Sequence, residues 1–152
     1  MTTTLKAQLR SDLTTAMKAR DGLRSATIRM ALTAITNEEV AGKVARELSE
    51  DEVLKVLGRE VKKRKEAAEA FAGAGRAEQA AREEAEGEVL SAYLPAQLSD
   101  EELQALVDAA VAESGAGGPR AMGAVMKVLT PRVAGRADGS RVAAAVKAKL
   151  SQ

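Results

Sequence analysis

The chain has 152 residues, lacks both cysteine and histidine, and carries 23 basic and 22 acidic side chains, for a formal net charge of +1. The missing cysteine excludes disulfide frameworks, thiolate nucleophiles and sulfur-ligated zinc sites, and the missing histidine removes the side chain that most often transfers protons near neutral pH. We therefore expect no catalytic, cofactor-binding or metal-binding residues, and any metal chemistry would have to use oxygen ligands alone.

The opening residues 1–6 lack the apolar segment of a secretion signal. No stretch of the sequence approaches the roughly twenty apolar residues that a membrane-spanning helix needs. We expect a soluble cytoplasmic protein that does not interact with membranes.

The amino-terminal part of the sequence begins with two helix patterns. Apolar residues recur at every fourth position from Leu5 to Met17, which predicts a first helix that ends near Arg20. A second apolar stripe follows from Leu23. We expect the second helix to end near Gly42, because glycine suits the left-handed position after a helix.

Two further helices are predicted before residue 94. Ser49 and Glu52 form a capping box at the start of the third helix, whose inward face includes Arg64. The fourth helix, at about 76–92, is rich in Ala and Glu, and we expect it to pack thinly or to move. Its acidic residues spread around the helix axis, so we interpret them as solvated and not as a metal site; they are Glu83, Glu84, Glu86 and Glu88.

The densest basic run of the chain lies at residues 59–65. Acidic residues interleave with it at helical spacing, so that Lys62 can pair with Glu66 and Lys65 with Glu69 across one turn. This pattern favours a salt-bridged, exposed helix face over a binding surface. A secondary contact to a nucleic acid is the alternative.

Pro95 marks the domain boundary, because proline breaks the helical pattern and restricts the residue before it. We predict an amino-terminal domain at 1–94 and a carboxy-terminal domain at 97–152. Strand signals are absent, so the predicted fold class is all-α, with four helices in the first domain and three in the second.

The carboxy-terminal domain starts with a second capping box, formed by Ser99 and Glu102. Its first helix is expected to end at the glycine-rich segment that begins at Gly115. A second helix should end at Pro131, and Ser140 is expected to cap the last helix. These helices present mainly Val, Leu and Met at helical spacing to their core.

Positive charge gathers at the end of the chain: from Ser114 to Gln152 there are seven Lys and Arg against one acid, Asp138. Such asymmetry indicates an anionic partner. The candidate phosphate-binding residues are Lys127, Arg132, Arg136 and Arg141, with turn amides around Gly135 and Gly139 as further donors. The alternative is a solvated cationic surface that balances the acidic helix at 100–113.

Several phrases together resemble the GatB/YqeY family, and the likeness covers the whole chain. They are Tyr93-Leu94-Pro95, Leu98-Ser99-Asp100-Glu101-Glu102-Leu103, Met122-Gly123-Ala124-Val125-Met126-Lys127 and Gly135-Arg136-Ala137-Asp138-Gly139. The resemblance implies a stand-alone YqeY-like protein. Its last domain would be similar to the tail of the B subunit of the tRNA-dependent amidotransferase, which contacts tRNA.

The resemblance therefore implies a non-catalytic accessory module that binds structured RNA, above all tRNA. Its protein partner would be the amidotransferase or a tRNA synthetase. Binding by shape and phosphate contacts fits a chain with one Phe, one Tyr and no Trp, since stacking on single-stranded bases needs aromatic side chains. Two alternatives are a component of a carbon–nitrogen ligase system with glutamine as amido donor, and a helical adapter that docks other proteins through its fourth helix.

Overall fold

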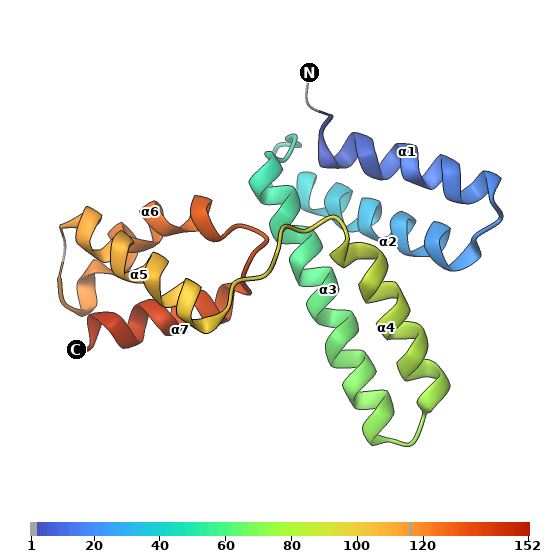
Figure 1. Cartoon of the computed structure of the whole chain (residues 1–152). Coiled ribbons are helices and arrows are strands. Elements are labelled where there is room, and N and C mark those ends of the chain that lie inside the picture. The colour runs from blue at the N-terminus through green and yellow to red at the C-terminus, as the bar shows by residue number, and fades with distance from the viewer. Residues whose placement is uncertain (1–2, 116) are drawn as a thin grey trace. The chain divides into compact units, whose positions relative to one another are not determined.

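A computed structural model describes residues 3–115 and 117–152 of the chain. The α-helices are α1 (Leu5–Lys18), α2 (Gly22–Glu39), α3 (Glu50–Gly73), α4 (Ala77–Ser91), α5 (Asp100–Ser114), α6 (Met122–Val133) and α7 (Gly139–Leu150), with a short 3₁₀ turn at Pro119–Ala121 (Figure 1). These ranges contain no strand, and the predicted all-α class is confirmed. None of the described helices is long and apolar enough to cross a membrane.

The chain divides into two compact units, Met1–Leu94 and Pro95–Gln152, and each has its own hydrophobic core. The first unit holds α1 to α4, in which α3 and α4 form a long antiparallel hairpin (Figure 1). The buried residues of its core cluster are aliphatic, and the partly buried Tyr93 packs against them; the buried residues are Leu9, Ile28, Ala31, Ile35, Leu48, Val53, Val56, Leu57 and Leu90. The predicted capping box is present at the start of α3, where the Ser49 hydroxyl accepts from the amide of Glu52 at 3.2 Å.

Two expectations for the first unit are wrong. The second helix ends at Glu39 and not near Gly42, because the Arg46 amide returns to the Glu39 carbonyl at 3.0 Å and satisfies the helix end without a left-handed glycine. Met17 is 51% exposed while Ala16 is buried. A four-residue spacing advances 40° per step on a 100° helix, so the stripe that starts at Leu5 has turned by about 120° at Met17.

Charged residues are buried between α3 and α4. Arg64 contacts Glu60 of its own helix, Nη1 to Oε1 at 3.5 Å, and Glu86 of α4, Nε to Oε2 at 3.7 Å. All three residues are at most 8% exposed. The predicted inward position of Arg64 is confirmed. The prediction of a solvated acidic cluster is wrong for Glu86, because acids that spread around α4 place this one against α3.

We predict that Glu86→Ala destabilises the protein by about 3 kcal/mol, because it leaves the buried Arg64 without its partner on α4. Glu84→Ala is the matched control on the exposed side of the same helix and should change stability by less than about 0.5 kcal/mol. Urea unfolding followed by circular dichroism measures both. Equal stabilities for the two variants would contradict a role of this ion pair in the hairpin.

The second unit packs α5, α6 and α7 around a core of its own, and α7 buries the predicted Val142, Val146 and Leu150. The second helix of this unit does not end at Pro131 but continues to Val133. The exposed proline costs the helix one hydrogen bond, while burial of Leu129 and Val133 holds the last turn in place. Asp138, and not Ser140, caps α7 by accepting from the Ser140 amide at 3.1 Å.

Independent folding of the second unit remains a prediction. The segment after Pro95 hydrogen-bonds within this unit: the Leu98 amide donates to the Arg136 carbonyl at 2.8 Å, and Gln97 Nε2 donates to the Gly135 carbonyl at 2.8 Å. We expect limited proteolysis near residues 93–98 to release a helical fragment that unfolds cooperatively, although about 60 residues give only a marginal core. A fragment without helical circular dichroism would contradict the two-domain organisation.

Candidate nucleic-acid interface

The four predicted phosphate-binding residues lie on three elements of the second unit. Lys127 and Arg132 belong to α6, Arg136 lies in the turn before α7, and Arg141 lies in the first turn of α7. Because α6 continues through Pro131, Arg132 is part of this helix. The sequence had predicted that the helix ends at Pro131 and that Arg132 lies in the turn after it.

Arg132 and Arg141 are both paired with acids of α5. Arg132 makes a two-pronged contact with Glu113, in which Nη2 lies 2.6 Å from Oε1 and Nη1 binds Oε2. Arg141 Nη2 lies 2.7 Å from Asp100 Oδ1. The hydrogen bond from Arg132 lowers the pKa of Glu113, and the same bond raises the pKa of Arg132. The predicted cationic segment thus receives compensating acids from a neighbouring helix.

A third pair repeats this arrangement at the other end of α7, where Lys149 Nζ lies 3.3 Å from Asp108 Oδ1. The pKa of Asp108 is lowered, mainly by the hydrogen bond from Gln104 and further by Lys149. Arg141 and Lys149 are eight residues apart and therefore lie on the same side of α7. That side of α7 faces α5.

Arg136 is half-buried at the turn between α6 and α7. Its Nη1 donates to the carbonyl of Arg132 at 3.3 Å. Its charge also helps to lower the pKa of Glu102, which the Ser99 hydrogen bonds lower most. Gly135 beside it has φ +71°, a conformation that favours glycine, so the turn geometry depends on this residue. The remaining guanidinium N–H groups of Arg136 can still serve a ligand.

Lys127 is exposed. Arg120 and Lys147 are exposed as well, but they were not among the four predicted phosphate-binding residues. Within residues 3–115 and 117–152, no carboxylate lies within ion-pair distance of these three side chains. Helical spacing could have identified Lys147, because Val146 and Val142 on the same helix mark the buried side. The pairing of the other cations with α5 had no signal in the local sequence.

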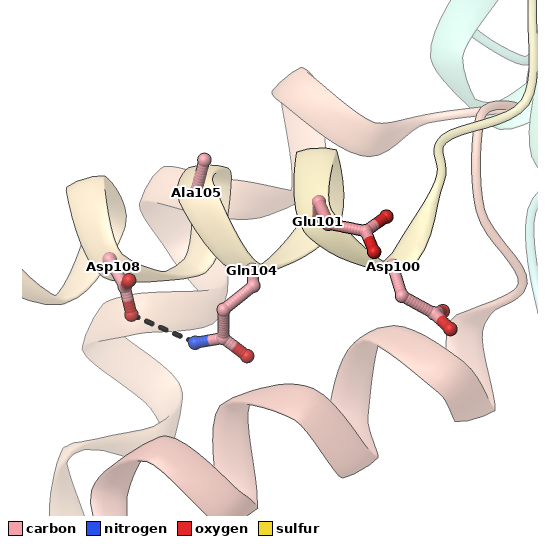
Figure 2. A pocket seen from close by; sticks show the side chains of 5 residues that line it. All are labelled: Asp100, Glu101, Gln104, Ala105 and Asp108. Atoms are coloured by element: carbon pink, nitrogen blue, oxygen red, sulfur yellow. Dashed lines mark hydrogen bonds between the residues drawn. The ribbon is translucent and has the colours of Figure 1, made fainter.

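Five of the six acids of this unit belong to α5. Asp100, Glu101, Gln104 and Asp108 of α5 line a shallow hollow of about 540 Å³ (Figure 2). Gln104 Nε2 donates to Asp108 Oδ1 at 2.8 Å, the contact drawn in Figure 2. Within the described residues, no group of three or more acidic side chains is arranged to hold a metal ion.

Some of the backbone amides around Gly139, which were predicted as donors to a phosphate, already donate hydrogen bonds within the protein. The carboxylate of Asp138 occupies the amino-terminal end of α7, where it accepts from both the amide and the hydroxyl of Ser140. The Gly135 carbonyl accepts from Gln97, and the amides of Arg136 and Ala137 both donate to the Val133 carbonyl, at 2.8 and 3.3 Å. The side chains of α6 and α7, more than the turn amides, are therefore the donors available to a phosphate.

Comparison with known proteins agrees with the motifs. Residues 6–150 match the model of a family described as Yqey-like protein, and this range includes nearly all of both units. No curated protein matches the chain. Because the family model covers nearly the whole chain, the chain belongs to the YqeY-like protein family.

Proposed function

We propose that this protein binds structured RNA, with tRNA as the specific class, through the face of α6 and α7 that is directed away from α5. The distribution of charge in the second unit carries the proposal. Every acid of this unit except Asp138 lies on α5, and three of the seven cations pair with them. The other four, Arg120, Lys127, Arg136 and Lys147, are left for a polyanion.

The surface around Lys127 is unusually open. Its neighbours on the exposed side of α6 are Gly123, Ala124 and Thr130. A Cβ atom built on Gly123 would have no neighbour within 4 Å, so this helical glycine is not required for packing against another helix of the described chain. Small side chains allow a phosphate backbone to come close to α6. On α7 the exposed Ala144 and Ala148 leave similar space near Lys147.

Recognition by shape and phosphate contacts suits this surface. The two aromatic residues of the chain, Phe71 and Tyr93, both belong to the first unit, so the second unit has no ring on which a base could stack. An A-form helix offers regular phosphates and 2′-hydroxyl groups across a wide minor groove. Basic side chains on two neighbouring helices are adequate for such contacts and would not read the base sequence.

We predict that Lys127→Ala with Lys147→Ala weakens tRNA binding much more than Arg132→Ala with Arg141→Ala. Both double variants remove the same charge, but only the first pair is unpaired in the folded protein. If the parent protein contacts four phosphates, the slope of log affinity against log salt concentration should lie between about −3 and −4. In the lysine variant this slope should be roughly halved. Filter binding or fluorescence anisotropy at several salt concentrations measures both quantities.

Circular dichroism must show that both double variants are folded. Equal loss of affinity in the two variants would mean that net charge alone matters and that the exposed face is not the binding surface. An unchanged affinity and slope in the lysine variant would contradict RNA binding by α6 and α7.

A second prediction concerns the paired arginines. Glu113→Gln removes the partner that holds Arg132, so the freed guanidinium should become available to phosphate and strengthen tRNA binding. Glu101→Gln is the matched control, because it removes the same charge from α5 without releasing a partner seen in the structure. A gain in affinity that is identical for both variants would assign the effect to net charge and not to the release of Arg132.

A further inference from the structure

A shallow groove lies on the first unit, between α2 and α3. It has a volume of about 360 Å³, and its lining includes Arg29, Met30 and Asn37 from α2 with Glu60 and Lys63 from α3. Residues 29, 33 and 37 are four apart, so they form one stripe along α2. The groove is open to solvent and is not an enclosed cavity.

The buried guanidinium of Arg64 lies behind this lining and is poorly satisfied. Its side chain is 6% exposed, and its Nη2 points to the sulfur of Met30 at 3.5 Å. Thioether sulfur is a weak acceptor. The contacts of Nη1, to the Glu60 carbonyl at 3.4 Å and to the Glu60 carboxylate at 3.5 Å, are also long, and Nε has no hydrogen-bond partner. Charge-assisted hydrogen bonds are usually about 2.7–2.9 Å long.

Met30 separates Arg64 from the solvent in the groove. It is 47% exposed, although it is a large apolar residue. Methionine is unbranched and changes rotamer easily, so its side chain can move without a change of the backbone. Movement of Met30 would expose Nη2 of Arg64 to the groove, where an oxygen acceptor would replace sulfur.

The charges at the groove favour an anion. Arg29, Lys63 and Arg64 contribute three positive charges, against the carboxylate of Glu60 at the groove and that of Glu86, whose Oε2 lies 3.7 Å from Arg64 Nε. The Glu60 carboxylate is itself held by Lys63, with Nζ 3.0 Å from Oε2. The amide of Asn37 provides a neutral donor at the same groove.

We propose that this groove binds a small ligand through an oxyanion group, a carboxylate or a phosphate. In the complex Arg64 Nη2 donates from the floor, Arg29 and Lys63 bind from the rim, and Met30 moves aside. The site belongs to the first unit and is separate from the RNA-binding face, so it adds a function to the one proposed above. A failure of either proposal leaves the other intact.

The test is a nuclear magnetic resonance titration of the full ¹⁵N-labelled chain with inorganic phosphate and, in a second series, with succinate. Sodium chloride at matched ionic strength is the reference. The Nε–Hε signal of Arg64, assigned by its loss in Arg64→Lys, should shift and saturate with at least one of the two anions. A response to phosphate alone identifies a phosphate site, and a response to succinate alone identifies a carboxylate site.

Variants distinguish a built site from general attraction of anions. Arg29→Ala with Lys63→Ala should weaken binding by about tenfold, as expected for the loss of about 1.4 kcal/mol of charge-assisted contacts. Lys18→Ala with Lys65→Ala removes two exposed charges outside the groove and should leave binding unchanged. Met30→Ala leaves the charge unaltered and should tighten binding, because the competing side chain is gone.

If the Arg29 and Lys63 double variant does not fold, Met30→Ala by itself tests the proposed anion site. An Arg64 signal that ignores both anions, or anion binding that is insensitive to Met30→Ala, would overturn the proposal. Equal weakening by the groove variant and by the Lys18 and Lys65 variant would do the same.

Discussion

Charge pairing between neighbouring helices determines which side chains of this protein are available to a ligand. The cores of both units are built from Ala, Val, Leu and Ile, with one Phe and one Tyr in the whole chain. Small side chains bring helices close together, so charged residues at the edges of the core meet across the contact. Arg64 with Glu86 in the first unit and Arg132 with Glu113 in the second are both of this kind.

The two contacts differ in their energetic consequences because they differ in burial. The Arg64 and Glu86 side chains are 6% and 10% exposed, so removal of one partner leaves a charge in a poorly solvated place. Arg132 and Glu113 are 38% and 51% exposed, and water can replace either partner. A surface pair of this type contributes little to stability but still occupies the guanidinium. It therefore affects ligand binding more than folding.

Pairing also ties up part of the positive charge of the second unit. α5 supplies nearly all of its acids and uses Asp100, Asp108 and Glu113 to hold cations of α6 and α7. Lys127 and Lys147 of the same unit have no carboxylate within ion-pair distance among the described residues. For the RNA binding proposed above, the local field around these cations, and not the small net charge of the unit, would guide the approach of the nucleic acid.

The sequence by itself determined the elements of this protein. Both capping boxes, at Ser49 and Ser99, start helices as predicted, and the helical spacing of Val142, Val146 and Leu150 identified a buried face. These features are local, because a cap and a helix face depend on residues within a few turns of each other. The family was recognisable for a related reason, since its motifs are short contiguous phrases.

Only the tertiary structure decided which charges are used internally. Glu86 belonged to a cluster that the sequence indicated to be solvated, and its partner Arg64 is 22 positions away on another helix. Arg132 and Arg141 are in a segment with a single acid, yet Glu113 and Asp100 reach them from α5. Helical periodicity tells which side of one helix is buried, but not which neighbour covers it. The relative placement of helices is set by packing over long sequence separations, and the cations that remain for a ligand follow from that placement.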